Sequence, residues 1–77
     1  MENLLTRITI NPKQLAGKPA IRGMRISVEQ ILNDLAKGIS VNEILANFPV
    51  LEADDIKACL LYASQVIESE ITIPVTS

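Results

Sequence analysis

Residues 27–69 contain three successive stretches in which apolar residues recur at helical spacing, and this pattern constrains the fold more than any other feature. Ser27, followed three residues later by Gln30, predicts a capping box at the start of the first helix, and Gly38 predicts its end. Because a helix with one apolar face must bury that face against a neighbour, three such helices in a short chain predict a single packed bundle.

The second and third helices carry their own boundary signals. Ser40 and Glu43 predict another capping box, and Pro49 ends the second helix because the residue before a proline disfavours helical geometry. The third helix is expected from near Glu52 to about Ser69, with carboxylates in its first turn where they favour the positive end of the helix dipole. Its expected buried stripe consists of Ala53, Ile56, Leu60, Ala63 and Ile67.

The first 26 residues read as extended chain. Thr6–Ile10 alternates in β-favouring residues, and Ala20–Ile26 forms a second extended stretch punctuated by glycines, so a short strand or hairpin is expected against the helices. We therefore predict an all-α fold, a three-helix, helix-turn-helix-like bundle with a short N-terminal β arm. The single domain would span residues 1–70, with the arm in 1–26 and a β-prone tail in 71–77.

Composition narrows the class of protein. The chain has 77 residues, of which 48% are hydrophobic, as in a folded domain rather than a disordered one. No apolar run approaches the ~20 residues of a membrane span, no signal peptide is evident, and a single cysteine fits a reducing compartment, so a cytoplasmic protein is expected. Domains this small often gain burial by oligomerising, which favours a homodimer.

The inventory of reactive side chains argues against catalysis. The chain has no histidine, the commonest general base and metal ligand. Cys59 lies in mid-helix with no base evident beside it and reads as a small buried hydrophobe. Asp54 and Asp55 are adjacent on a helix and would diverge rather than share a site. We expect no catalytic residues, no bound metal and no cofactor.

Several motifs resemble the bacterial family known as domain of unknown function 433. The most specific is Gly-Lys-Pro-x-Ile-Arg-Gly-x-Arg-Ile at residues 17–26, and together the motifs cover residues 7–64. The resemblance implies a three-helix, homeodomain-like bundle with an extended arm. It also implies, more loosely, an antitoxin-type partner of a small nuclease-like toxin, with self-regulation through DNA. Met24 replaces the family's usual threonine, and Glu52 stands where a Ser or Thr cap is usual.

Charge is unevenly distributed along the chain. Residues 1–30 carry five basic side chains against two acidic ones, whereas residues 31–77 carry two against seven. Lys18, Arg22 and Arg25 lie among glycines and a proline, and arginine forks suit phosphate or carboxylate groups. This arm could contact DNA phosphates or an acidic partner, or its arginines could simply pair with carboxylates of the chain's own helices.

Two classes of partner remain open. The second and third helices have the layout of a helix-turn-helix, which permits DNA binding. However, the third helix begins with acidic residues, and only Lys57 there is basic. This local charge and the overall pI near 4.9 oppose binding to DNA phosphates. Leu61, Tyr62 and Val66 widen the apolar face of the third helix and suit a protein interface, unless they complete the core.

The leading hypothesis is therefore a non-enzymatic, antitoxin-type protein that binds a toxin-like protein partner. The alternative is a DNA-binding regulator, and the third is a dimerisation scaffold. If Arg22, Arg25 and Lys57 share one solvent face, the DNA hypothesis gains; if the arginines pair with carboxylates, it loses.

Overall fold

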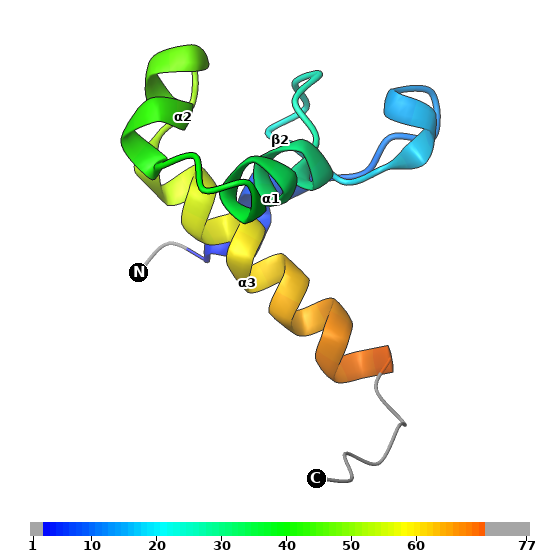
Figure 1. The fold of residues 1–77 in the computed structure, drawn as a ribbon. Helices are drawn as coiled ribbons and strands as arrows, with labels where there is room; N and C mark the ends of the chain where they lie inside the picture. Colours follow the sequence, from blue (N-terminus) through cyan, green and yellow to red (C-terminus); the bar gives the residue numbers. More distant parts are fainter. Residues whose placement is uncertain (1–2, 71–77) are drawn as a thin grey trace, which may run out of the picture.

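A computed structural model of the chain, which describes residues 3–70, consists of three α-helices preceded by a short two-stranded antiparallel hairpin (Figure 1). In chain order the elements are the 3-10 helix η1 (Leu4–Arg7), β1 (Ile8–Thr9), the 3-10 helix η2 (Leu15–Gly17), β2 (Ala20–Ile21), α1 (Val28–Ala36), α2 (Val41–Asn47) and α3 (Ala53–Glu70). The prediction of three helices with a short β arm is confirmed. The β-prone tail, residues 71–77, lies outside the described residues.

The predicted caps at the starts of α1 and α2 are both formed, but the α1 cap makes only one of the two hydrogen bonds of a capping box. Ser40 and Glu43 make a complete capping box, in which the Glu43 N–H donates to Ser40 Oγ at 3.1 Å and the Ser40 N–H donates to Glu43 Oε1 at 3.5 Å. At α1, the Gln30 N–H donates to Ser27 Oγ at 3.0 Å. The Gln30 side chain makes no return bond within residues 3–70, so the box predicted there is a simple cap.

The N-terminal arm is shorter in strand than its composition suggests. β1 and β2 pair antiparallel, with Ile8 opposite Ile21 and Thr9 opposite Ala20. The first two residues of the predicted strand Thr6–Ile10 belong instead to η1, which packs against α3. Contact with α3 therefore overrides the β preference of these residues, as tertiary context commonly does.

The expectation that Ala20–Ile26 is one extended stretch is wrong beyond Ile21. Arg22 and Gly23 both adopt left-handed backbone conformations, with φ values of 47° and 72°, and they reverse the chain. The Ile21 N–H then donates to the carbonyl of Ile26 at 3.0 Å. Two successive left-handed residues are the geometry of a tight hairpin turn, and glycine at the second one avoids the penalty that a β-carbon would bring.

One core joins all three helices to the hairpin. Its fully or almost fully buried apolar side chains are Ile21, Val28, Ile31, Ile44, Leu51, Ile56 and Cys59. Each of β2, α1, α2 and α3 supplies at least one of them, so none of these elements buries its apolar face alone. Hydrophobic burial of about 1.5–3 kcal/mol for each large side chain is the main force that holds the arm and the helices together.

The buried side of α3 differs from the predicted stripe. Leu60 and Ile67, both expected in the core, are 51% and 54% exposed. The buried line instead contains Asp55 and Cys59, with Tyr62 half-buried one turn further on. Two physical reasons account for the error. The buried line begins with a charged residue, which hydrophobicity alone does not select, and the C-terminal half of α3 extends beyond the other helices (Figure 1).

Candidate functional site

Arg22, a predicted partner-contacting residue, is partly exposed, but its guanidinium pairs with the buried carboxylate of Asp55 in the same chain. From the hairpin turn, its Nε donates to Asp55 Oδ1 at 3.1 Å and its Nη2 donates to Asp55 Oδ2 at 2.8 Å. The same Nη2 also donates to the carbonyl of Val50 at 2.7 Å. This bidentate geometry is the one in which a guanidinium binds a carboxylate most strongly. Arg22 therefore fastens the hairpin turn to the loop and helix start that follow α2.

Arg7 completes the arrangement from the other side. Its Nη1 donates to Asp55 Oδ1 at 2.9 Å and to Glu52 Oε1 at 2.7 Å. The backbone N–H of Glu52, the residue before α3, donates to Asp55 Oδ2 at 2.8 Å, which is the half of a capping box that a side chain in the first turn makes. We refer to Arg7, Arg22, Glu52 and Asp55 as the Asp55 cluster. This cluster was not predicted from the sequence. The available signal was that Asp55 lies four residues before Cys59, which places it on the same side of α3 as a buried residue.

The Asp55 carboxylate is fully buried and ionised. Burial alone raises the pKa of a carboxyl group, but the hydrogen bonds from Arg22, from the Glu52 N–H and from Arg7 together lower the pKa of Asp55 below its ordinary value of 3.8. The hydrogen bond to Asp55 correspondingly raises the pKa of Arg22. Because its oxygens are occupied by these donors, Asp55 holds the fold together and is not exposed to a substrate.

The other predicted basic residues do not form one free positive surface. Lys18 Nζ lies 2.9 Å from Glu29 Oε1, and Lys57 Nζ lies 4.0 Å from Asp54 Oδ1. Arg25 is exposed and makes no ion pair or hydrogen bond within residues 3–70. The pairing of the arm with the chain's own carboxylates, one of the interpretations left open by the sequence, is thus the observed arrangement for Arg22 and Lys18.

Cys59 is completely buried, which confirms its interpretation as a small core residue. Burial, together with the negative charge of Asp55, raises the pKa of its thiol to about 11. The thiolate, which is the nucleophilic form, is therefore scarce at neutral pH. Within the described part of the chain, no group of three His, Cys, Asp or Glu side chains is arranged to hold a metal ion, and no helix is long and apolar enough to cross a membrane.

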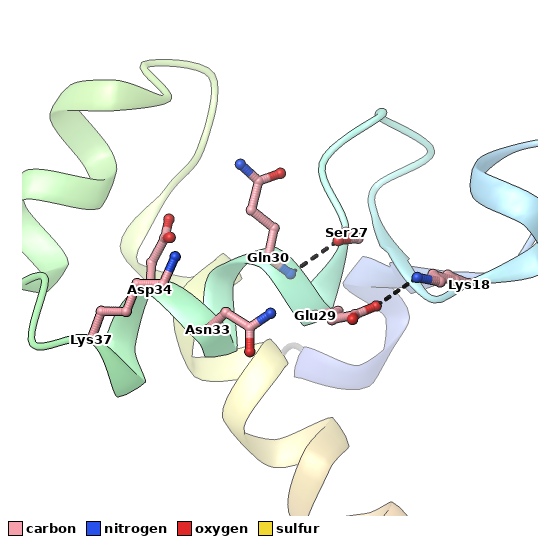
Figure 2. Close-up of a pocket in the computed structure, with 7 residues that line it drawn as sticks. All are labelled: Lys18, Ser27, Glu29, Gln30, Asn33, Asp34 and Lys37. Carbon is pink, nitrogen blue, oxygen red and sulfur yellow. Dashed lines mark hydrogen bonds and ion pairs between the residues drawn. The ribbon is translucent and has the colours of Figure 1, made fainter.

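A polar cleft of about 380 Å³ lies along the outer side of α1 (Figure 2). At one end Lys18 pairs with Glu29, and toward the other end lie Asp34 and Lys37, while the Gln30 side chain points away from the helix. These side chains carry both signs of charge and stand on an open surface. The cleft therefore has the character of a solvated helix face rather than of a binding pocket.

A second depression of about 330 Å³ is apolar and lies between α1 and the C-terminal half of α3. Its principal walls are Pro19, Val28, Leu32, Tyr62, Val66 and Ile67, and we refer to it as the α1–α3 groove. Of the predicted interface residues, Tyr62 and Val66 line this groove, whereas Leu61 lies outside it. The α1 side of the groove was not predicted as interface, because its residues also carry the ordinary core pattern of a helix.

Together, the hairpin, the three helices and the Asp55 cluster define a small, mainly helical domain with an arm clamped to the start of its third helix. The chain belongs to the family described as "Protein of unknown function (DUF433)", which matches residues 8–63. This match confirms the resemblance drawn from the Gly-Lys-Pro and Arg-Gly motifs.

Two relatives support the assignment. The chain is 36% identical over 56 residues to "Uncharacterized protein y4eO" of Sinorhizobium fredii (strain NBRC 101917 / NGR234), an alignment that covers 73% of this chain and 25% of that protein. It is also similar to the crystal structure of a DUF433 member protein from Anabaena variabilis ATCC 29413, with a TM-score of 0.76 and 35% identity over 82% of this chain. The chain thus spans a quarter of the first relative and 62% of the second.

Proposed function

We propose that this domain is a non-enzymatic protein-binding module that holds an apolar segment of a basic partner protein in the α1–α3 groove. The observation that carries the proposal is the groove itself. Leu32, Tyr62 and Val66 are only half-buried there, and Ile67 is 54% exposed. Apolar side chains grouped around a concave surface gain free energy when a partner removes them from water.

The size of the groove suits a few large side chains rather than a whole protein surface. A volume of about 330 Å³ accommodates two or three apolar side chains of a helix or an extended segment. At about 1.5–3 kcal/mol for each fully buried side chain, such an anchor supplies a substantial part of a binding free energy. The polar side chains of Glu29 and Asn33 at the edge would orient the segment.

Charge favours a basic partner. Residues 31–77 carry seven acidic side chains against two basic ones, and Glu29, which pairs with Lys18, stands at the edge of the groove. A small nuclease-like protein is basic where it contacts the phosphates of its substrate. The antitoxin-type role that the family resemblance implies is therefore the specific form of this proposal, with a small toxin-like nuclease as the partner.

A DNA-binding regulator is less well supported. The residues expected to contact DNA were Lys18, Arg22, Arg25 and Lys57. Only Arg25 among them makes no ion pair with a carboxylate of the described residues. Releasing Arg22 to bind a phosphate would leave the buried Asp55 with one guanidinium fewer, which is energetically unfavourable.

The test compares three forms of the tagged full chain purified from the native host at moderate salt, with mass spectrometry of the bound material. Val66→Glu places a charge in the groove, and Gln65→Glu adds the same charge at the adjacent exposed position as a matched control. We expect a stoichiometric, basic, small protein to bind the wild type and Gln65→Glu, and to bind Val66→Glu at least about tenfold more weakly.

Binding can then be measured with the purified partner by following tyrosine fluorescence. Tyr62 is the single tyrosine of the chain and lines the groove. Its fluorescence therefore reports occupancy of the groove when the partner contributes no emission at the same excitation wavelength. Equal binding by Val66→Glu and Gln65→Glu would contradict the proposal. Recovery of nucleic acid alone, released as salt rises, would favour the DNA-binding alternative.

A further inference from the structure

We infer that the outer face of α3 pairs with the same face of a second copy of this chain, with the two helices antiparallel. The outer face consists of Ala53, Lys57, Leu60, Ser64 and Ile67, together with Glu68 at its edge. This surface is distinct from the α1–α3 groove of the function proposed above, because the two lie on neighbouring sides of α3 and share only Ile67.

The outer face has the spacing of a helix–helix seam. Its members follow one another at intervals of four, three, four and three residues, which is the heptad pattern by which two helices stay in contact. Every one of them is exposed within this single copy, and Leu60 and Ile67, one heptad apart, are 51% and 54% exposed. The core, η1 and α1 cover other sides of α3, so a second helix can approach this face.

The charges on the face select the antiparallel arrangement. Lys57 lies in the N-terminal half of the face and Glu68 at its C-terminal end, eleven residues or about 16 Å apart along the axis. When two copies cross antiparallel near Tyr62 and Ala63, Lys57 of each copy stands beside Glu68 of the other. A parallel pair would place lysine beside lysine and glutamate beside glutamate.

Neither charged side chain has a strong partner among the described residues of the single copy. Lys57 Nζ reaches Asp54 Oδ1 only at 4.0 Å, and the Glu68 side chain makes no ion pair or hydrogen bond within residues 3–70. In the antiparallel pair, Ile67 of one copy falls between Leu60 and the aliphatic stem of Lys57 on the other. Ser64, a small residue near the centre, permits close approach of the helices.

The area of the face sets the strength of the dimer. α3 has 18 residues and is about 27 Å long, and only two large apolar side chains per copy lie on this face. This is less than a standard protein–protein interface buries, so we expect a reversible dimer with a Kd in the micromolar range or weaker.

The experiment is sedimentation equilibrium of the full chain over a concentration series, with four variants whose substituted residues are all exposed. Leu60→Glu should weaken the dimer at least about tenfold, since each dimer loses two apolar side chains from the seam. Lys57→Glu and Glu68→Lys should each weaken it about three- to tenfold, because each places like charges side by side.

The double variant Lys57→Glu with Glu68→Lys is the decisive control. It exchanges the charges and restores opposite signs across an antiparallel pair, so its Kd should return to within about threefold of the wild type. A chain that is monomeric at every concentration, a dimer unaffected by Leu60→Glu, or single charge variants that the double variant does not rescue would each overturn the inference. Circular dichroism confirms that each variant is folded before its Kd is interpreted.

Discussion

Replacing Asp55 by asparagine tests the most distinctive feature of this fold. The substitution preserves the shape of the side chain but removes its charge. It also replaces one acceptor oxygen by an NH₂ donor, which would face the N–H groups of Arg22 or of Glu52. The two guanidiniums of Arg7 and Arg22 would then lie close together without the carboxylate that neutralises them.

The expected loss is large relative to the stability of so small a domain. Removing one member of a buried, hydrogen-bonded ion pair destabilises proteins by about 3–5 kcal/mol. A 77-residue domain has a total free energy of unfolding of about 4–12 kcal/mol. Asp55→Asn should therefore remove about a quarter or more of the free energy of unfolding, and a weakly stable wild type would leave this variant largely unfolded.

Urea denaturation followed by helical circular dichroism measures this effect. With an m-value of about 1 kcal/mol/M, a loss of about 3–5 kcal/mol should lower the midpoint by about 3–5 M, or unfold the variant in water. Asp54→Asn is the matched control, because Asp54 is adjacent but half-exposed and lies 3.9 Å from Arg7 and 4.0 Å from Lys57, so its loss should be no more than about 1 kcal/mol. Similar midpoints for the two variants would refute the argument that the buried cluster stabilises the fold.

Three further predictions concern the acidity of Asp55, the burial of Cys59 and the cap of α2. Because the pKa of Asp55 is lowered in the folded state, its contribution to stability is fully present above the ordinary pKa of 3.8 and is lost as pH falls through the lower folded value. The free energy of unfolding, measured from pH 5 to pH 2, should therefore fall more steeply for the wild type than for Asp55→Asn. Because the folded pKa of Cys59 is about 11 against an ordinary 9.0, the free energy of unfolding should fall as pH rises between these values, and Cys59→Ala should abolish this part of the loss. At neutral pH, a thiol reagent should react with Cys59 only as fast as the domain opens. Ser40→Ala should lower the free energy of unfolding by about 1 kcal/mol through loss of the α2 cap, whereas Ser64→Ala, on the exposed middle of α3, should change it by less than half as much; equal effects would contradict the capping role.

The Asp55 cluster also changes the meaning of the most specific motif in the chain. Arg22 and Gly23, which suggested an anion-binding arm, form a left-handed turn that directs the Arg22 guanidinium onto a buried carboxylate. The side chain of Lys18 pairs with Glu29 at the start of α1. The motif therefore attaches the arm to the helices. Of its basic residues, only Arg25 extends into solvent without a carboxylate partner among the described residues.

The helices were predictable because their signals are local. Ser40, Glu43 and Gly38 act on backbone groups within a few residues of themselves, so their effect does not depend on the rest of the fold. The same is true of the positions at which α1 and α2 end. The burial of Cys59 also followed from its mid-helix position and its chemistry.

The candidate surfaces were only partly predictable. Tyr62 and Val66 were identified from the widened apolar face of α3, and both line the groove. Leu61 belonged to the same pattern but lies outside the groove, because one residue turns a helix by about 100° and only the placement of α1 decides which direction is lined. Leu60 and Ile67 were expected in the core and are exposed for the same reason.

By itself, the sequence determined the number and limits of the helices, the presence of a β arm and membership of the family, because these depend on periodicity, on caps and on a specific motif. Only the tertiary structure decided which side of α3 is buried, that Arg7 and Arg22 meet at Asp55, and which apolar residues remain at the surface. The physical reason is distance along the chain. Asp55 is 48 residues from Arg7 and 33 from Arg22, and a charge acquires a place in a core only when folding brings its counterions to it.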